Sequence, residues 1–343
     1  MNLTKTSAAL ICLGPDRGGA LDVRQVLRRK PAPNEVEVAV EAASVNPIDV
    51  RRREGYGRRL LGLLGAAKFP LVLGNDFAGT VTAVGSRASP FKIGDRVYGV
   101  KPPSRKGTQA CHVLVKAAHA RLAPAGRDIQ DLAALPYCFV TMWLAIRAAG
   151  LSRQNAVGRR VLVHGAAGGL GTLALQMLSN WGAEITAIAW SSAFAACRQA
   201  GADEVLDVGT KPFSALGHSF DATLNFATWN DELALISCLK DGALGHATTV
   251  HPLMRNFDVH GWLIGALRTI QDKRRCRATL PKETRNYAWI AFRPDEDALF
   301  ELSELVERHG LSLPIGPRVP LGQAGEAFEH IMNRRSGRAL ILP

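Results

Sequence analysis

Residues 161–171 read VLVHGAAGGLG, an apolar run that leads into a glycine-rich stretch. Ala166, Gly168 and Gly171 have the spacing of the Gly-x-Gly-x-x-Gly fingerprint, with alanine at its first position. A glycine at 168 lets the backbone reach a pyrophosphate, a glycine at 171 lets a helix pack close to the strand before it, and free N–H groups at the helix start hold negative charge. The stretch predicts a dinucleotide-binding loop, and a tight strand-to-helix turn without a ligand is the alternative.

The next expected strand, EITAIAW, ends in Trp190, Ser191 and Ser192. In dinucleotide-binding domains an Asp or Glu at this point, about 20 residues downstream of the glycines, binds the free hydroxyls of the adenine ribose, whereas a 2′-phosphate needs room and hydroxyl or basic partners. Residues 190–192 include no carboxylate, and the nearest basic residue, Arg198, is not at the strand end. The sequence therefore favours NADPH over NADH.

The size and cysteine content place limits on the protein class. The chain has 343 residues, 47% of them hydrophobic, and exceeds the size at which one core usually stops growing, so two domains are expected. The first residues lack a signal-peptide pattern, and no run of about 18 apolar residues occurs to span a bilayer. The six cysteines include no close pair, which argues against a disulfide framework and a Cys-x-x-Cys metal site. We expect a soluble protein of the reducing cytoplasm.

The net charge is +12, from 42 Lys and Arg against 30 Asp and Glu. Such a balance fits nucleic acid, anionic lipid or an anionic small molecule. The basic residues fall in short groups at 51–53, 273–277 and 334–335, with no aromatic-interleaved RNA-binding motif and no zinc-finger spacing. Solvated surface accounts for most of this charge, and an anionic ligand such as a dinucleotide or a coenzyme-A ester is favoured over nucleic acid.

Two patterns divide the chain. Strand-like runs with valines at every second position dominate the first part, at 34–45, 80–85, 96–100 and 110–115. From about residue 127, strands alternate with helical segments of 10 to 15 residues, which predicts βαβ crossovers and a parallel sheet. A last helix stops at Gly310, and short strands return at the C-terminus. The sequence predicts an α/β protein in which residues 1–126 and 310–343 form a β-rich domain and residues 127–309 a doubly wound parallel-sheet domain.

Several motifs occur in order along the whole chain. They are AASVNPIDVRRREGYG (42–57), FPLVLGNDFAGTVTAVG (69–85), FKIGDRVYG (91–99), LPYCFVTMWLAI (135–146), VLVHGAAGGLG (161–171), AGADEVLDV (200–208) and SGRALIL (336–342). In these motifs and their spacing the chain resembles a zinc-free medium-chain dehydrogenase/reductase of the quinone oxidoreductase branch, and within it the group of reticulon-4-interacting proteins.

The resemblance implies a GroES-like catalytic domain that carries an inserted Rossmann domain for NADP, with the nicotinamide in the cleft between them. Zinc-dependent relatives have a cysteine near Asn46, and a Gly-His-Glu triplet where this chain has Gly74, Asn75 and Asp76. The cysteine-rich lobe for structural zinc is also absent from the sequence, and none of the nine histidines has a metal-ligand pattern. The expectation is a protein without zinc.

Cofactor-binding residues follow from the resemblance position by position. It places the pyrophosphate at Ala167, Gly168, Gly169, Leu170 and Gly171, and the adenosine phosphate near Ser191. Val208 stands where the family usually has a tyrosine beside the adenine.

The nicotinamide side follows in the same way. Asn225 and Thr249 are expected to border the nicotinamide ribose, and Ile290 and Phe292 to reach the nicotinamide. The segment Arg335, Ser336 and Gly337 matches a C-terminal cofactor-side segment of the family, and Arg338 replaces the usual lysine.

Three residues are candidates for the catalytic position. The resemblance places Asn46 and Thr141 nearest the reacting ring, and Tyr56 on the loop that covers the substrate, where its hydroxyl is a candidate proton donor. Two of them also have a purely structural explanation. Asn46 would then be a turn residue before a proline, and Thr141 a helix residue whose hydroxyl has no role in catalysis.

The leading hypothesis is an oxidoreductase that passes hydride from NADPH to a quinone or an enone. Reduction of an enoyl thioester is the alternative within the enzyme class, because the basic residues at 51–59 suit a phosphorylated carrier. A non-catalytic NADPH-binding module that interacts with RNA is the alternative from another class. The sequence leaves the oligomeric state open, a homodimer included.

Overall fold

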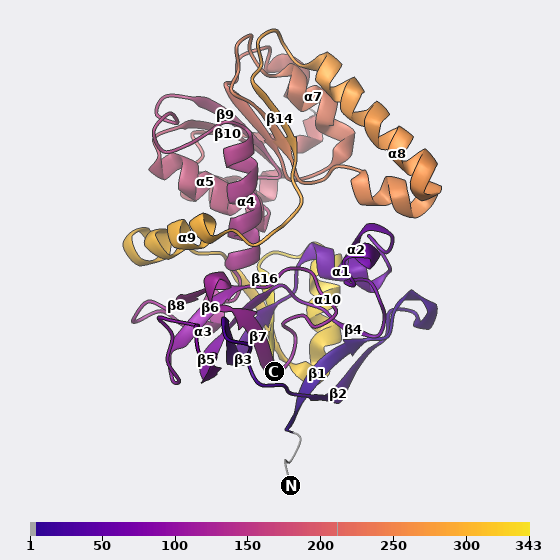
Figure 1. Ribbon diagram of the computed structural model, residues 1–343. Helices are drawn as coiled ribbons and strands as arrows, with labels where there is room; N and C mark the ends of the chain where they lie inside the picture. The colour runs from indigo at the N-terminus through magenta and orange to yellow at the C-terminus, as the bar shows by residue number, and fades with distance from the viewer. Residues whose placement is uncertain (1–4, 211) are drawn as a thin grey trace. The chain divides into compact units, whose positions relative to one another are not determined.

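The computed structural model describes residues 5–210 and 212–343 (Figure 1). The chain divides into two compact units. Unit 1 consists of Met1–Tyr137 and Arg293–Pro343, and unit 2 consists of Cys138–Phe292. Unit 2 is thus shorter at both ends than the range 127–309 expected for the nucleotide-binding domain, and the helix that stops at Gly310 lies in unit 1.

Unit 2 contains a sheet of six parallel strands. In chain order they are β9 (Arg160–His164), β10 (Glu184–Ala189), β11 (Glu204–Asp207), β12 (Ala222–Asn225), β13 (Gly245–Thr248) and β14 (Asn286–Trp289). Their spatial order is β11-β10-β9-β12-β13-β14. This is the doubly wound order 3-2-1-4-5-6, in which the strand order reverses between β9 and β12 and ligands bind outside the carboxyl ends of the strands. The predicted α/β fold class is confirmed.

Helices precede and connect these strands. They are α4 (Pro136–Ala148), which begins at the boundary between the units, α5 (Gly169–Asn180), α6 (Phe194–Gln199), α7 (Glu232–Ser237) and α8 (Leu253–Thr279). Within the described residues, one stretch, Ile129–Ala148, is apolar and long enough to cross a membrane by length and composition, but 72% of it is buried inside the protein. Burial of that kind is typical of a core helix.

The described residues of unit 1 form two sheets. The larger has the order β15-β16-β3-β5-β6-β8, with β7 paired to β3, and the smaller has the order β2-β1-β4. The strand bounds are β1 (Thr6–Cys12), β2 (Leu21–Leu27), β3 (Glu35–Ser44), β4 (Leu71–Val72), β5 (Asp76–Val84), β6 (Arg96–Val100), β7 (His112–Lys116), β8 (Ala120–Leu122), β15 (Ile315–Pro320) and β16 (Arg338–Leu342). Because β16 pairs with β3, the C-terminal strand lies beside one from the first fifty residues.

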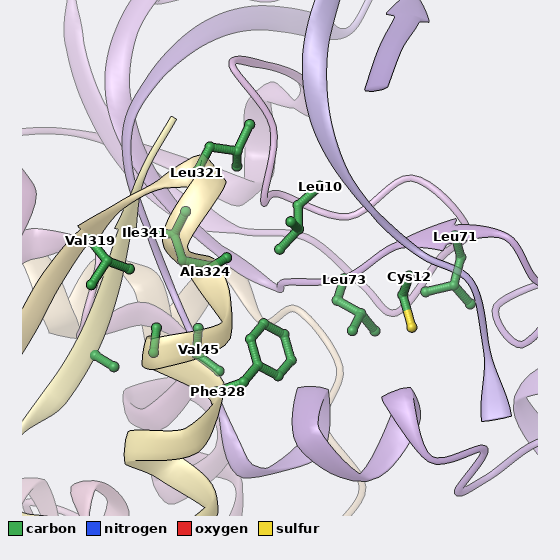
Figure 2. Close-up of a cluster of buried hydrophobic side chains, with 12 residues drawn as sticks. Leu10, Cys12, Val45, Leu71, Leu73, Val319, Leu321, Ala324, Phe328 and Ile341 are labelled. Atoms are coloured by element: carbon green, nitrogen blue, oxygen red, sulfur yellow. The ribbon is translucent and has the colours of Figure 1, made fainter. Parts of the chain in front are cut away.

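The described part of unit 1 also contains five α-helices: α1 (Pro47–Arg53), α2 (Leu60–Leu63), α3 (Ile129–Leu132), α9 (Glu296–His309) and α10 (Ala324–Met332). One core of this unit forms where α10 packs on the strands (Figure 2). Phe328 of α10 lies there beside Val45 and Leu73, all three almost completely buried. Val45 immediately precedes Asn46, the residue before α1, so this core lies at the start of that helix.

Candidate active site

The glycine-rich loop joins β9 to α5 and depends on two of its glycines for its shape. Gly165 has φ 82°, in the left-handed region that favours glycine. A Cβ atom at Gly171 would lie 2.3 Å from the carbonyl oxygen of Gly165 and 2.5 Å from the Cα of Ala166. These two glycines are therefore required by the turn itself.

Gly168 is different, because the fold does not require a glycine there. Its φ and ψ of −78° and 168° are open to any residue, and an added Cβ would meet only the Gly165 carbonyl oxygen, at 3.4 Å. Ala167 and Gly168 are exposed, and α5 begins at the next residue. The first intrahelical bond is donated by the Thr172 N–H to the Gly168 carbonyl, at 2.8 Å. The N–H groups of residues 169–171 thus remain available to an anionic group.

The other residues expected at the cofactor in unit 2 lie at or just beyond the carboxyl ends of the parallel strands. They are Ser191 after β10, Val208 after β11, Asn225 at the end of β12, Thr249 after β13, and Ile290 and Phe292 after β14. The topology thus brings them to the same edge of the sheet as the glycine loop. Their contacts with a cofactor stay predictions.

Asn225 is fully buried, and its side chain is engaged within the protein. Its amide nitrogen donates to the carbonyl oxygen of Thr228 and to Glu232 Oε2, both at 2.8 Å, and its amide oxygen accepts from the backbone N–H of Ala227 at 3.2 Å. Glu232 also binds His246 Nε2 at 3.1 Å. Asn225 therefore shapes the loop after β12, and its backbone carbonyl accepts the N–H of Thr249 at 3.1 Å.

Trp190 is a candidate cofactor contact that the sequence interpretation left out. It follows the last residue of β10 and is 65% exposed, although tryptophan is usually well buried. A Cβ atom added at Gly209 would lie 3.5 Å from its ring, so the indole lies beside the loop after β11. The sequence contained one signal for this role. Val208 stands where the family usually has a tyrosine, so an aromatic ring from the neighbouring strand β10 can take the place of that tyrosine.

In unit 1 a buried polar cluster surrounds Asn46, the residue before α1. Its amide nitrogen donates to Asp76 Oδ2 at 2.8 Å and to the Ser44 hydroxyl at 3.0 Å, and its amide oxygen accepts from Arg338 Nη2 at 2.5 Å. Ser44 also donates to Asp76. All four side chains are buried. Asn46 thus links the carboxylate of Asp76 to the guanidinium of Arg338. We therefore describe Asn46 as a residue that positions these two groups in unit 1.

Asp76 and Arg338 are the charged members of this cluster. Burial raises the pKa of Asp76 from 3.8 to about 6, against the opposing effects of its hydrogen bonds and of the Arg338 charge. Arg338 also donates from Nη2 to the carbonyl oxygen of Val45 at 3.0 Å. The guanidinium is therefore held against the backbone of Val45 and the side chain of Asn46, just before α1.

The remaining predicted residues are divided between the units. Tyr56 is half-buried in the turn after α1, with the guanidinium of Arg51 5.5 Å from its ring centre, and Thr141 is buried on α4 in unit 2. Arg335 and Ser336 are exposed before β16. Gly337 has φ 87° and lies against Gly316, so the turn requires this glycine.

No group of three or more His, Cys, Asp or Glu residues that could hold a metal ion occurs in residues 5–210 and 212–343. All six cysteines are free thiols. Asn46 and Asn75 stand at the positions where the resemblance implies a cysteine and a histidine in zinc-dependent relatives.

Comparison with known proteins identifies the family. Residues 32–126 match the family described as "Alcohol dehydrogenase GroES-like domain", and residues 200–337 match "Zinc-binding dehydrogenase". The Bos taurus protein "NAD(P)H oxidoreductase RTN4IP1, mitochondrial" is 34% identical over 317 residues, which cover 86% of this chain and 78% of that protein. The chain belongs to the medium-chain dehydrogenase/reductase superfamily. The resemblance drawn from the motifs is confirmed, and this membership makes the chain an oxidoreductase.

Other relatives agree with this assignment. The Homo sapiens protein of the same name is also 34% identical, over 86% of this chain and 78% of its own length. The quinone oxidoreductase from Coxiella burnetii has the same fold, with a TM-score of 0.79 over 99% of this chain and 100% of that chain, at 23% identity. An alcohol dehydrogenase superfamily protein from Novosphingobium aromaticivorans superposes with a TM-score of 0.76 over 98% of this chain and 99% of that chain, at 25% identity.

The cytoplasmic location expected from the sequence is wrong on this comparison. The relatives from Bos taurus, Mus musculus, Homo sapiens and Danio rerio are all named as mitochondrial. The expectation rested on free cysteines, and free thiols indicate a reducing environment without indicating which reducing compartment it is.

Proposed function

We propose that this oxidoreductase transfers hydride from NADPH to a quinone or another conjugated carbonyl compound, without a bound metal ion. The observation that carries the proposal is the guanidinium of Arg338 in the Asn46 and Asp76 cluster. A carbonyl that no metal polarises must already be electrophilic, and conjugation supplies this property. Because the similar proteins are named mitochondrial, we also propose mitochondria as its location.

Zinc does not fit the residues at this position. Asn46 and Asn75 provide amides where zinc sites have thiolate or imidazole ligands. The amide oxygen of Asn46, the better donor to a metal, already accepts a hydrogen bond from the cationic Arg338. A divalent cation there would displace this bond and lie beside a fixed positive charge, which supports hydride transfer without zinc.

A nicotinamide cofactor fits unit 2. The glycine loop leaves open space over Gly168, and the N–H groups at the start of α5 are positioned to hold a pyrophosphate. Trp190, Ser191 and Ser192 are exposed at the end of β10 and provide an aromatic face and two hydroxyl groups but no carboxylate. This set supports NADPH rather than NADH, and the bound cofactor supplies the hydride.

The residues of this chain would then hold the reactants and exclude water. Ile290 and Phe292 follow β14 at the nucleotide edge and offer apolar surface to the nicotinamide. In unit 1, Asn46 fixes the start of α1, and Tyr56 follows this helix with a hydroxyl that can carry a proton. We keep Asn46, Tyr56 and Thr141 as the proposed residues nearest the reaction.

Enoyl-thioester reduction, the alternative suggested by the basic residues at 51–59, is the second candidate. Residues of this chain also match a "Mycocerosic acid synthase-like polyketide synthase" of Mycobacterium tuberculosis at 35% identity over 222 residues. The match covers 63% of this chain and 10% of that protein. The basic group at 51–59 gives this reading less support than the sequence suggested. Arg52 and Arg53 donate to backbone carbonyls of unit 1, so a phosphorylated carrier would meet fewer free charges.

The deciding experiment measures NADPH oxidation with a panel of quinones, enones and enoyl thioesters, with and without a strong chelator, alongside metal analysis. We expect the quinones and enones to be reduced well above background, at rates that the chelator does not change. About one zinc per chain, or loss of activity in chelator, contradicts the metal-free mechanism. Tight NADPH binding without turnover, together with salt-sensitive RNA binding, would favour the non-catalytic module instead.

A further inference from the structure

Helix α8 exposes a large apolar surface. Six large apolar side chains within residues 259–270 are between 46% and 74% exposed: Val259, Trp262, Leu263, Ile264, Leu267 and Ile270. They make up six of the sixteen exposed large apolar side chains in the described part of the chain. Soluble proteins rarely expose contiguous apolar patches of more than a few hundred Å², and larger patches mark interaction sites.

A break at Gly261 sets the direction of this surface. Gly261 has φ 76° and ψ −172°, a region that is essentially restricted to glycine, and no atom lies within 4 Å of an added Cβ. The bend therefore requires a glycine because of its backbone conformation, and not because a side chain would clash with neighbouring atoms. Figure 1 shows α8 in orange, bent near its start. The segment after the bend packs on the segment before it, since Asn256 donates to Thr269 at 3.3 Å and to Asp272 at 2.9 Å.

The second segment, residues 262–279, has a buried and an outward face. Gly265, Thr269 and Cys276 are buried and share one side of the helix. Leu263, Leu267, Ile270 and Arg274 follow one another at spacings of four, three and four residues, so they form a stripe on the opposite side. The stripe is apolar at its first three positions and ends in an arginine.

Four arginines, Arg268, Arg274, Arg275 and Arg277, are exposed on this segment. In the described residues none of them forms an ion pair. The two other charged side chains of the segment are engaged inward: Asp272 accepts from Asn256, and the ammonium group of Lys273 lies 5.0 Å from the ring centre of Trp289. The exposed surface of the segment therefore carries positive charge without a compensating carboxylate.

We propose that this surface, defined by the six apolar side chains and the four arginines, binds the face of an anionic membrane. The apolar side chains would enter the boundary between headgroups and acyl chains, while the guanidinium groups bind lipid phosphates. A second copy of the chain that docked through this same surface would present the same arginines, so it would bury the apolar side chains while leaving the charge unpaired. An anionic membrane provides an apolar interior for the apolar side chains and lipid phosphates for the arginines. This argument does not depend on the proposed substrate.

The test is co-sedimentation of the full chain with vesicles of phosphatidylcholine alone and with phosphatidylglycerol added. We expect binding that requires the anionic lipid and weakens with salt. Replacing the four arginines by glutamine should weaken binding by roughly 600-fold, because each of the four basic residues contributes roughly a fivefold factor. The double variant Leu263→Ser, Leu267→Ser should weaken it by more than about tenfold, because less apolar area enters the membrane.

Two control variants match these changes. Glutamine at four other exposed basic positions, Arg17, Arg87, Lys92 and Lys116, lowers the net charge equally, and Ile93→Ser with Val157→Ser removes comparably exposed apolar side chains. We expect each control to lose less than about fivefold in binding. Equal losses in controls and α8 variants, or no binding to anionic vesicles, overturn the proposal. So does light scattering that shows a dimer which Leu263→Ser, Leu267→Ser converts to a monomer, because α8 is then an interface between copies.

Discussion

The substitution Gly168→Val should separate cofactor binding from folding in the glycine loop. At Gly168 the backbone conformation suits valine, and an added Cβ meets only the Gly165 carbonyl oxygen, at 3.4 Å. The two methyl groups would instead extend into the exposed space before α5, which the pyrophosphate must enter. We expect NADPH affinity to fall by well over tenfold, or more than about 1.4 kcal/mol, and the unfolding midpoint to change by no more than about 3 °C.

Gly171→Ala is the matched control, because it should lower the stability of the fold, whereas Gly168→Val should lower the affinity for NADPH. The added Cβ would lie 2.3 Å from the Gly165 carbonyl oxygen and 2.5 Å from Ala166 Cα, and neither backbone atom can move without opening the turn. Overpacking of this kind costs about 1–3 kcal/mol, so the unfolding midpoint should fall by several degrees, on the order of 5 °C.

Isothermal titration with NADPH gives the affinities, and thermal unfolding followed by circular dichroism gives the midpoints. The reasoning is refuted if folded Gly168→Val binds NADPH as tightly as the unaltered chain, because the loop is then only a turn. It is also refuted if Gly171→Ala unfolds at the same temperature as the unaltered chain, because the close approach of helix and strand then has no energetic consequence.

Three further predictions concern the rest of the site. The chain should bind NADPH about ten- to a hundredfold more tightly than NADH, and Ser191→Asp should shift this ratio toward NADH; titration of both cofactors at one salt concentration checks this, and equal affinities in the unaltered chain contradict it. Trp190→Ala should weaken NADPH binding roughly fivefold, about 1 kcal/mol of lost ring stacking, and an unchanged affinity would remove Trp190 from the cofactor site. The buried Asp76 has a folded-state pKa of about 6, above the unfolded value of 3.8, so its contribution to stability is full below pH 3.8 and is lost as the pH rises through 6. As the pH rises from 4 to 7, the free energy of unfolding of Asp76→Asn should therefore increase by about 2 kcal/mol relative to that of the unaltered chain. A difference between the two chains that does not vary with pH would show that Asp76 is not buried as an acid.

The nucleotide-binding half of the fold was largely predictable from the sequence. Strands of four to six residues alternate with helices, and this local pattern was enough to predict a parallel sheet with the glycine loop between β9 and α5. The sequence alone also shows that residue 171 is a glycine and that residues 190–192 include no carboxylate. Each of these signals lies within a few neighbouring residues, where backbone geometry and residue type determine the structure directly.

Contacts between distant residues could not be predicted in this way. Asn46 and Arg338 are separated by 292 residues, and they meet because β16 pairs beside the end of β3. The sequence interpretation noted Arg338 only as a substitution for lysine, and no periodicity connects it to Asp76. The difference in role between Gly168 and Gly171 also depends on which backbone atoms lie around each position.

The sequence by itself determined the fold class, the dinucleotide-binding loop and the membership of an oxidoreductase family, since these follow from short-range periodicity and from motifs in a fixed order. Only the tertiary structure decided that a guanidinium lies beside Asn46, that Trp190 is exposed, and that α8 turns apolar side chains outward. The physical reason is that burial and exposure are properties of what packs against a residue. A leucine on α8 has the same hydrophobicity in a core as on a surface, and only the packing of the chain around it decides which of the two it occupies.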